Sequence, residues 1–158
     1  DRTHRESQIE TEVAQAAAAK LGIRADAIPV DSQVTLNLAL ERIAAELPDA
    51  IYVSFVAGVI ARNRTAIAEF GLRHRLPLIS AWAFMTEAGG LLSYSPDIQA
   101  MFRRSAYYVD RILKGAKPAE LPIEQATKIE LVVNAGTARK LGITLPPDIV
   151  LHADRVIE

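Results

Sequence analysis

The sequence contains no cysteine, and this absence excludes several kinds of chemistry at once. A chain without thiols has no disulfide framework, no thiolate zinc site and no cysteine nucleophile. The three histidines, His4, His74 and His152, lie in unrelated segments, and no metal-ligand spacing such as H-E-x-x-H occurs. We therefore expect no metal site and no cofactor.

Neither sign of charge is in excess. The chain has 18 lysines and arginines against 19 aspartates and glutamates, for a formal net charge of −1. Domains that bind nucleic acid or anionic membranes usually carry a clear basic surplus. The balance of charge therefore predicts no nucleic-acid partner.

Long apolar runs are also missing. No stretch reaches the roughly 18 residues that a membrane-spanning helix needs. The first seven residues, DRTHRES, are polar and do not resemble a signal peptide, which has a basic segment followed by an apolar one. We expect the chain to be a mature, processed or partial sequence, so its compartment stays open on these grounds.

Short motifs of common enzymes are not present. There is no G-x-S-x-G elbow and no phosphate-binding P-loop, and Gly89-Gly90 lacks the G-x-G-x-x-G pattern of a dinucleotide site. We therefore predict no catalytic residues and a protein that is not an enzyme.

The chain does have enough apolar residues for a folded core. Half of its 158 residues are hydrophobic, which is sufficient for one domain. Over the first 81 residues, hydrophobic periodicity predicts helices at 7–21, 31–47 and 58–73, and strands at 23–30, 50–57 and 76–81. The strand at 50–57 is almost entirely apolar, which is typical of a strand buried on both faces. This alternation predicts an α/β fold, with a parallel sheet flanked by helices on both sides.

The pattern changes after residue 81. We predict a short helix at 83–88, an extended piece at 91–94, a long helix opened by Ser95-Pro96-Asp97, a strand at 128–134, and helices at 135–141 and 147–157. Residues 1–93 then form one α/β domain, and residues 94–158 form a crossing helix, a strand and C-terminal helices. Because doubly wound domains normally open with a strand, we expect an opening strand before Asp1.

Several blocks of the sequence resemble one bacterial family. These blocks are HRLPLI (74–79), EAGGLLSYSPD (87–97), RRSAYYVDRILKGAKP (103–118), LPIEQ (121–125), ELVVN (130–134), TARKLGI (137–143) and ADRVIE (153–158). Together they resemble the C-terminal half of the substrate-binding proteins of ABC transporters. The residues before Arg73 fit the middle region of that family more loosely.

This resemblance implies a type I periplasmic binding protein fold, in which two α/β lobes are joined by hinge strands and close on a solute. It implies a small-molecule solute and an ABC permease as partners, and a periplasmic or other extracytoplasmic location. Some members of the family are implicated in the uptake of tryptophan or other aromatic amino acids. This chain would hold most of the second lobe and the segments that return to a missing first lobe.

Candidate binding residues follow from strand ends. In open α/β sheets, ligands lie beyond the carboxyl ends of the strands. Segments 54–57 and 81–84 follow two such ends, and segment 89–94 resembles a crossing towards the other lobe. We therefore predict solute-binding side chains at Phe55, Val56, Trp82, Phe84, Ser93 and Tyr94. For the two phenylalanines, packing in the core is the alternative.

The other candidates have alternatives of their own. Trp82, the only tryptophan, could stack on a flat or apolar solute, or pack within the lobe. Tyr94 could supply a ring and a hydroxyl, or pack at the hinge. Ser93 could donate to a solute carboxylate, or satisfy the backbone of a turn. Glu87 could receive a solute amine, or be an exposed carboxylate on a helix.

Two other function classes stay open. The same layered fold hosts flavodoxin-like and Rossmann-like enzymes, and binding-protein lobes also serve as ligand-sensing regulatory domains. Since one lobe supplies half a cleft, we expect the 158-residue chain alone to bind solute weakly or not at all. An orphan lobe would also expose apolar surface, so a homodimer of the chain is a further expectation.

Overall fold

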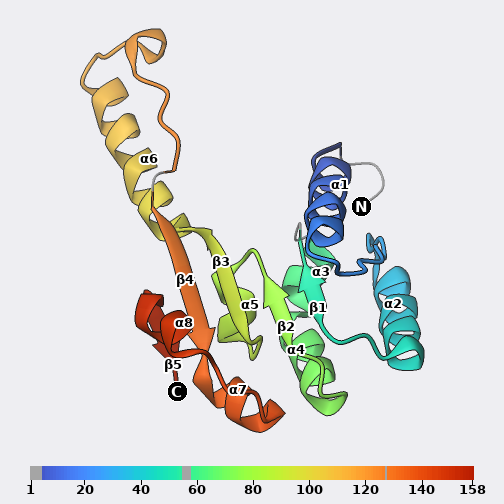
Figure 1. The fold of residues 1–158 in the computed structure, drawn as a ribbon. Helices are drawn as coiled ribbons and strands as arrows, with labels where there is room; N and C mark the ends of the chain where they lie inside the picture. The colour runs from blue at the N-terminus through green and yellow to red at the C-terminus, as the bar shows by residue number, and fades with distance from the viewer. Residues whose placement is uncertain (1–4, 55–57, 127) are drawn as a thin grey trace.

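A single mixed sheet is the centre of the molecule. The computed structural model describes residues 5–54, 58–126 and 128–158. Five strands lie side by side in chain order (Figure 1): β1 (Ile51–Val53), β2 (Leu78–Ser80), β3 (Leu92–Pro96), β4 (Ile129–Asn134) and β5 (Arg155–Ile157). Only the β3–β4 pair is antiparallel. The predicted α/β fold with a mostly parallel sheet is confirmed.

The two faces of the sheet differ sharply in exposure. The strand register aligns Val53 with Ser80, Ser80 with Ser93, and Ser93 with Val132, so these side chains share one face. All four are buried, and we call this the buried face. On the opposite, open face, Tyr52 is 53% exposed and Tyr94 is 64% exposed. The prediction that the strand around residues 50–57 is buried on both faces is therefore wrong at Tyr52.

The core forms where helices cover the buried face. The short helix α5 (Ala83–Glu87) contacts β2, β3 and β4, and α4 (Arg64–Arg73) packs against α5. The core cluster consists of Leu36, Val53, Val59, Ile67, Leu78 and Met85. Met85 is fully buried at its centre. This core positions the turn that follows β2.

Helix α2 (Gln33–Glu46) begins as its sequence predicts. The Ser32 hydroxyl accepts a hydrogen bond from the amide of Thr35 at 3.2 Å. The Thr35 hydroxyl accepts one from the Ser32 amide at 3.0 Å, which completes a capping box. The helix stops at Leu47, which adopts a left-handed conformation with φ of 44°.

The strand predicted at residues 23–30 does not form. Helix α1 (Arg5–Lys20) is followed by residues 23–30, which belong to no helix or strand, and residues 21–27 are exposed. A strand needs a hydrogen-bonded neighbour, and the only strand paired with β1 among the described residues is β2. The alternation at residues 23–30 therefore predicted a strand that takes no place in the sheet.

The helix predicted at residues 58–73 is divided in two. Helix α3 (Gly58–Arg62) ends at Asn63, and α4 begins at the next residue. The Asn63 side-chain amide donates to the Val59 carbonyl at 2.8 Å, and the Asn63 main-chain amide donates to the same oxygen at 3.1 Å. Asparagine side chains compete for backbone groups in this way, which interrupts helices.

The C-terminal elements depart from prediction at two boundaries. The long helix α6 (Ile98–Leu113) begins after Asp97, and Pro96 belongs to β3 and not to the first helical turn. Helix α7 (Ala135–Leu141) lies where predicted, but the predicted helix 147–157 is α8 (Pro147–His152) followed by β5. Asp154 causes this change: its amide donates to the Leu131 carbonyl, and its carboxylate accepts from the Leu131 amide, each at 2.9 Å. These bonds align the last residues with β4.

Helix α6 extends away from the sheet as an arm, and the following segment, with the 3₁₀ turn η1 (Pro118–Glu120), runs back beside it to β4 (Figure 1). No residue of α6 is buried. Its apolar side chains are open to solvent: Phe102 is 73% exposed and Leu113 is 81% exposed. Within the described part of the chain, no helix is both long and apolar enough to cross a membrane.

Candidate functional site

The carboxyl ends of β1 and β2 are joined by a small hydrogen-bond network. The Ser80 hydroxyl donates to the Val53 carbonyl at 3.3 Å and accepts from the Trp82 amide at 3.1 Å. The Ala81 amide donates to the same Val53 oxygen at 3.3 Å. Ser80 is 2% exposed, so this network is shielded from water. It holds the turn after β2 against the end of β1.

Trp82 is the principal side chain of this edge. It is the N-cap residue of α5, and its indole nitrogen donates to the Ser54 carbonyl at 3.2 Å. Its ring centroid lies 6.0 Å from that of Phe84, and both half-buried rings pack against the core. The indole N–H is therefore fixed by β1, and the rest of the ring is left partly open. Two other predicted residues, Phe55 and Val56, follow Ser54 but lie outside the described residues.

Ser93 and Tyr94 are neighbours in sequence that point to opposite faces of β3. Ser93 is completely buried, and its hydroxyl has no hydrogen-bond partner within the described protein. The Thr86 hydroxyl on α5 is buried and unpartnered in the same way. Tyr94 lies on the open face. The structure therefore does not bring Ser93 and Tyr94 together in one pocket.

A hollow of about 570 Å³ lies between α4 and α5. Its lining is Ala61, Arg64, Thr65, Phe84, Glu87 and Ala88. Of the predicted binding residues that the structure describes, it includes only Phe84. The Glu87 carboxylate at its rim is bonded to Arg155 at 2.6 Å, which leaves it less free to receive a solute amine.

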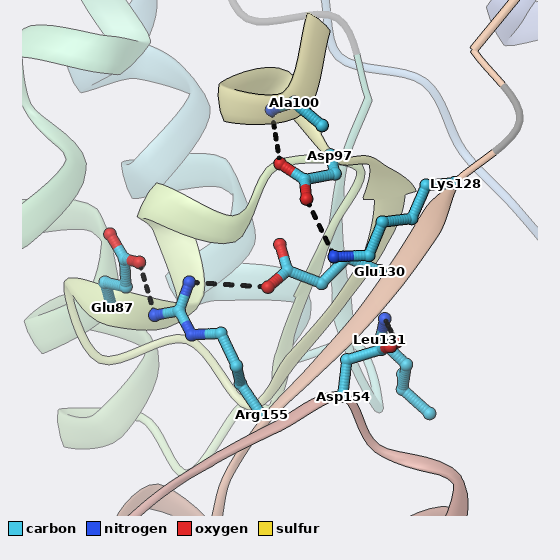
Figure 2. A network of polar contacts seen from close by, with 8 residues as sticks. All are labelled: Glu87, Asp97, Ala100, Lys128, Glu130, Leu131, Asp154 and Arg155. Carbon is cyan, nitrogen blue, oxygen red and sulfur yellow. Dashed lines mark hydrogen bonds and ion pairs between the residues drawn. The ribbon is translucent and has the colours of Figure 1, made fainter. Parts of the chain in front are cut away.

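Arg155 connects three elements (Figure 2). Its guanidinium contacts Glu87 of α5 at 2.6 Å and Glu130 of β4 at 3.6 Å. These contacts raise the pKa of the Arg155 guanidinium above its ordinary range, chiefly through the hydrogen bond that it donates to Glu87. Sequence reasoning missed this network, because Glu87 and Arg155 are 68 positions apart.

A second polar contact missed in the sequence lies where β3 passes into α6. One Asp97 carboxylate oxygen accepts from the Ala100 amide at 2.8 Å, and the other accepts from the Lys128 ammonium at 2.9 Å (Figure 2). These two hydrogen bonds, the first above all, hold the pKa of the Asp97 carboxyl below its ordinary range. The S-P-D pattern signals a helix cap, but nothing local signals the partner at position 128.

Farther along the arm, α6 is tied to the returning segment. Arg104 makes a bidentate ion pair with Glu124 and lies 4.0 Å from the ring centroid of Tyr107. The Tyr108 hydroxyl donates to the Pro122 carbonyl at 2.8 Å. The hydrogen bond from Arg104 lowers the pKa of the Glu124 carboxyl. A hollow of about 460 Å³ lies between these two segments.

Among the residues that are described, no group of three or more histidine, aspartate or glutamate side chains is placed to hold a metal ion. The sheet edge offers a partly open indole beside main-chain groups, an arrangement that can bind a small solute.

The fold is shared with solved structures of solute-binding proteins. A conserved domain protein from Vibrio cholerae is 28% identical with a TM-score of 0.77, over 92% of this chain and 48% of that one. A domain in complex with L-Trp from Streptococcus pneumonia is 26% identical with a TM-score of 0.84, over 98% of this chain and 53% of that one. The ligand-free, open structure of a Clostridium difficile substrate-binding protein is 16% identical with a TM-score of 0.69, over 98% and 51% of the two chains. The chain thus spans about half the length of these proteins.

No curated protein sequence matches the chain. One protein-family model matches the chain over residues 3–157, which is nearly its whole length. That model describes ABC transporter substrate-binding proteins, which are binding proteins and not enzymes. The chain therefore belongs to the ABC transporter substrate-binding protein family.

Proposed function

We propose that this chain supplies one half of a two-lobed protein that captures a small solute at the carboxyl edge of β1 and β2. The observation that carries the proposal is the position of Trp82. Its indole N–H is fixed on the Ser54 carbonyl, and its ring stays partly open beside the strand ends. An aromatic wall of this kind suits a flat or apolar ligand. The similar Streptococcus pneumonia domain bound to L-Trp makes an aromatic amino acid the first solute to test.

In this proposal the second-lobe domain ends at residue 93, within β3. Residues 94–158 would then form a crossing helix, a hinge strand and C-terminal segments that return towards a first lobe, and residues 1–93 the second-lobe domain. Support comes from exposure: Met101, Phe102 and Leu113 on α6 are open to solvent, as is Tyr94 on the sheet. Apolar surface of this extent usually marks an interface. The half-length match to the similar structures agrees with a lobe that is not in this chain.

Closure of the two lobes on the solute would produce the form that a permease recognises. We therefore extend the proposal to delivery of the solute to an ABC permease, outside the cytoplasm. This part rests on family membership alone. Among the predicted binding residues, Trp82 and Phe84 lie at the proposed edge, and Phe55 and Val56, outside the described residues, stay predictions. Tyr94 and Ser93 stay predictions, with Tyr94 favoured by its exposure.

In the 158-residue chain Trp82 serves as its own fluorescence reporter, because these residues contain no other tryptophan. This chain would be titrated with L-phenylalanine and L-tyrosine by fluorescence and with L-tryptophan by calorimetry, since the free amino acid emits. A longer protein that also carries the first lobe, and its variants, would be titrated with all three by calorimetry. We expect micromolar binding by the two-lobed protein and little or none by the chain alone, which supplies half of the contacts.

A pair of variants separates the site from the fold. In the two-lobed protein, Trp82→Leu should weaken solute binding by about tenfold or more, because it removes the aromatic wall. Arg139→Met, on α7 at the opposite edge of the sheet, is the control and should leave affinity unchanged. Solute binding of equal strength by the isolated chain, or unaltered affinity in Trp82→Leu, would contradict the proposal.

A further inference from the structure

The arm, α6 with the segment that returns beside it, is joined to the sheet at two points, and Asp97 forms the first. Strand β3 ends at Pro96 and α6 begins at Ile98, so Asp97 alone separates a strand from a 16-residue helix. Its backbone is extended, with φ −68° and ψ 94°, as is usual for the residue that caps a helix. A change in the direction of the arm must be absorbed at Asp97 and where the returning segment enters β4, since hinges are a few residues at element ends.

Asp97 is held by four hydrogen bonds, two of them with the same residue. Its amide donates to the Lys128 carbonyl at 3.1 Å, and its carboxylate accepts from the Lys128 ammonium at 2.9 Å. The remaining carboxylate oxygen caps α6 at Ala100, and the Asp97 carbonyl accepts from the Met101 amide at 3.1 Å. The Asp97 side chain is 11% exposed, whereas that of Lys128 is 61% exposed. Lys128 directly precedes β4, where the returning segment re-enters the sheet.

Both connections between the sheet and the arm thus meet at the Asp97–Lys128 pair. Beyond this point the arm behaves as one body, because Arg104 pairs with Glu124 and Tyr108 bonds to Pro122 across its two segments. A rotation at the Asp97–Lys128 pair would therefore move the whole arm, and the far end of α6 would move farthest.

We propose that the Asp97–Lys128 pair is the latch that sets the direction of the arm, and through it the equilibrium between the open and closed forms of the two-lobed protein. Asp97 and Lys128 are positioning residues: they act on solute affinity through the angle between lobes, without a contact to solute. The expected effect on solute affinity rests on the proposed function. The expected effect on the direction of the arm, the geometric half of the proposal, concerns the described chain alone.

The geometric half is tested with paired spin labels. Because the chain has no cysteine, Arg73→Cys on α4 and Leu113→Cys at the end of α6 introduce two unique label sites, both exposed. We expect one narrow distance distribution for this labelled parent. Asp97→Asn keeps the helix cap, and Lys128→Met keeps the aliphatic stem, but each removes the ion pair. Each should broaden or shift the distribution, and the double variant should add little.

Lys117→Met is the matched control, because it removes an ammonium on the same arm that lies 3.4 Å from Glu120. It should leave the distribution as in the parent. Distributions unchanged in both latch variants would overturn the proposal. Equal broadening in the control would also overturn it, since any charge removed from the arm would then suffice.

The functional half is measured as solute affinity in the two-lobed protein. Asp97→Asn and Lys128→Met should change the apparent Kd by about 3- to 10-fold, because they alter the fraction of the binding-competent form. A moved arm with unaltered Kd would overturn the latch as a device of the binding cycle. If the two-lobed protein bound no solute at all, the proposed function would fail, and the spin-label distances would still decide whether the pair directs the arm.

Discussion

The indole nitrogen of Trp82 donates a hydrogen bond to the Ser54 main-chain oxygen at 3.2 Å, and this bond joins the ends of two parallel strands. Trp82→Phe keeps an aromatic ring but removes the donor. We expect it to lower the free energy of unfolding by about 0.5–1.5 kcal/mol, the usual net value of one hydrogen bond. Urea unfolding followed by circular dichroism measures this. Tyr52→Phe, on the open face of β1, is the control and should have little effect.

Arg155→Met should loosen the C-terminal strand from α5 and β4. The contacts with Glu87 and Glu130 are partly solvated, so the loss of stability should be about 1 kcal/mol and should shrink at high salt. Arg139→Met removes a more exposed pair with Glu158 and should cost less than about 0.5 kcal/mol. Equal losses of unfolding free energy in the two variants would show that the Arg155 contacts between elements stabilise the fold no more than an exposed ion pair does.

The two methionines of the chain form a natural comparison. Met85 is fully buried in the core, whereas Met101 on α6 is 45% exposed. Met85→Ala should cost about 2–5 kcal/mol, because it leaves a cavity, and Met101→Ala should cost little in the 158-residue chain. In a two-lobed protein the cost of Met101→Ala should rise, if the arm packs on the first lobe. An identical small cost in both proteins would count against that packing.

Acid should weaken the fold partly through Asp97. Its folded-state pKa is lowered, first by the Ala100 amide and then by Lys128, with a smaller effect of Arg103. Stability from this group is therefore complete above the unfolded-state pKa of about 3.9 and is lost as pH falls from there through the lowered value. Asp97→Asn should reduce the difference in unfolding free energy between pH 6 and pH 3, as measured by urea titration. Glu124 also has a lowered pKa, so part of the difference should remain.

The isolated chain should associate with itself. The arm presents Phe102 and Leu113 to solvent, and apolar surface of this kind favours pairing of two copies. We expect sedimentation equilibrium to show a dimer at chain concentrations of about tens of micromolar, because modest interfaces have dissociation constants in about the micromolar range. Phe102→Ser should shift the population to monomer, whereas the exposed-charge variant Lys117→Met should not. A monomer at all concentrations would contradict this prediction.

Local chemistry in the sequence was enough to predict several features. The start of α2 near residues 31–32, the end of α7 before Gly142, and the strand at 128–134 all depend on residues within a few positions of one another. The resemblance of the C-terminal blocks also predicted the family correctly. The position of Trp82 at a strand end came from the same periodicity, and its role in solute binding stays a prediction.

Tertiary structure decided the features that depend on distant partners. Residues 23–30 have the alternation of a strand but take no place in the sheet, whereas residues 155–157 become a strand because Asp154 bonds to Leu131. The pairs Asp97–Lys128 and Glu87–Arg155 span 31 and 68 positions. Periodicity and capping report on contacts within a turn or two of chain. Which segments meet across the sheet depends on the packing of the whole lobe. For this reason only the folded chain revealed the Asp97–Lys128 pair at the base of α6.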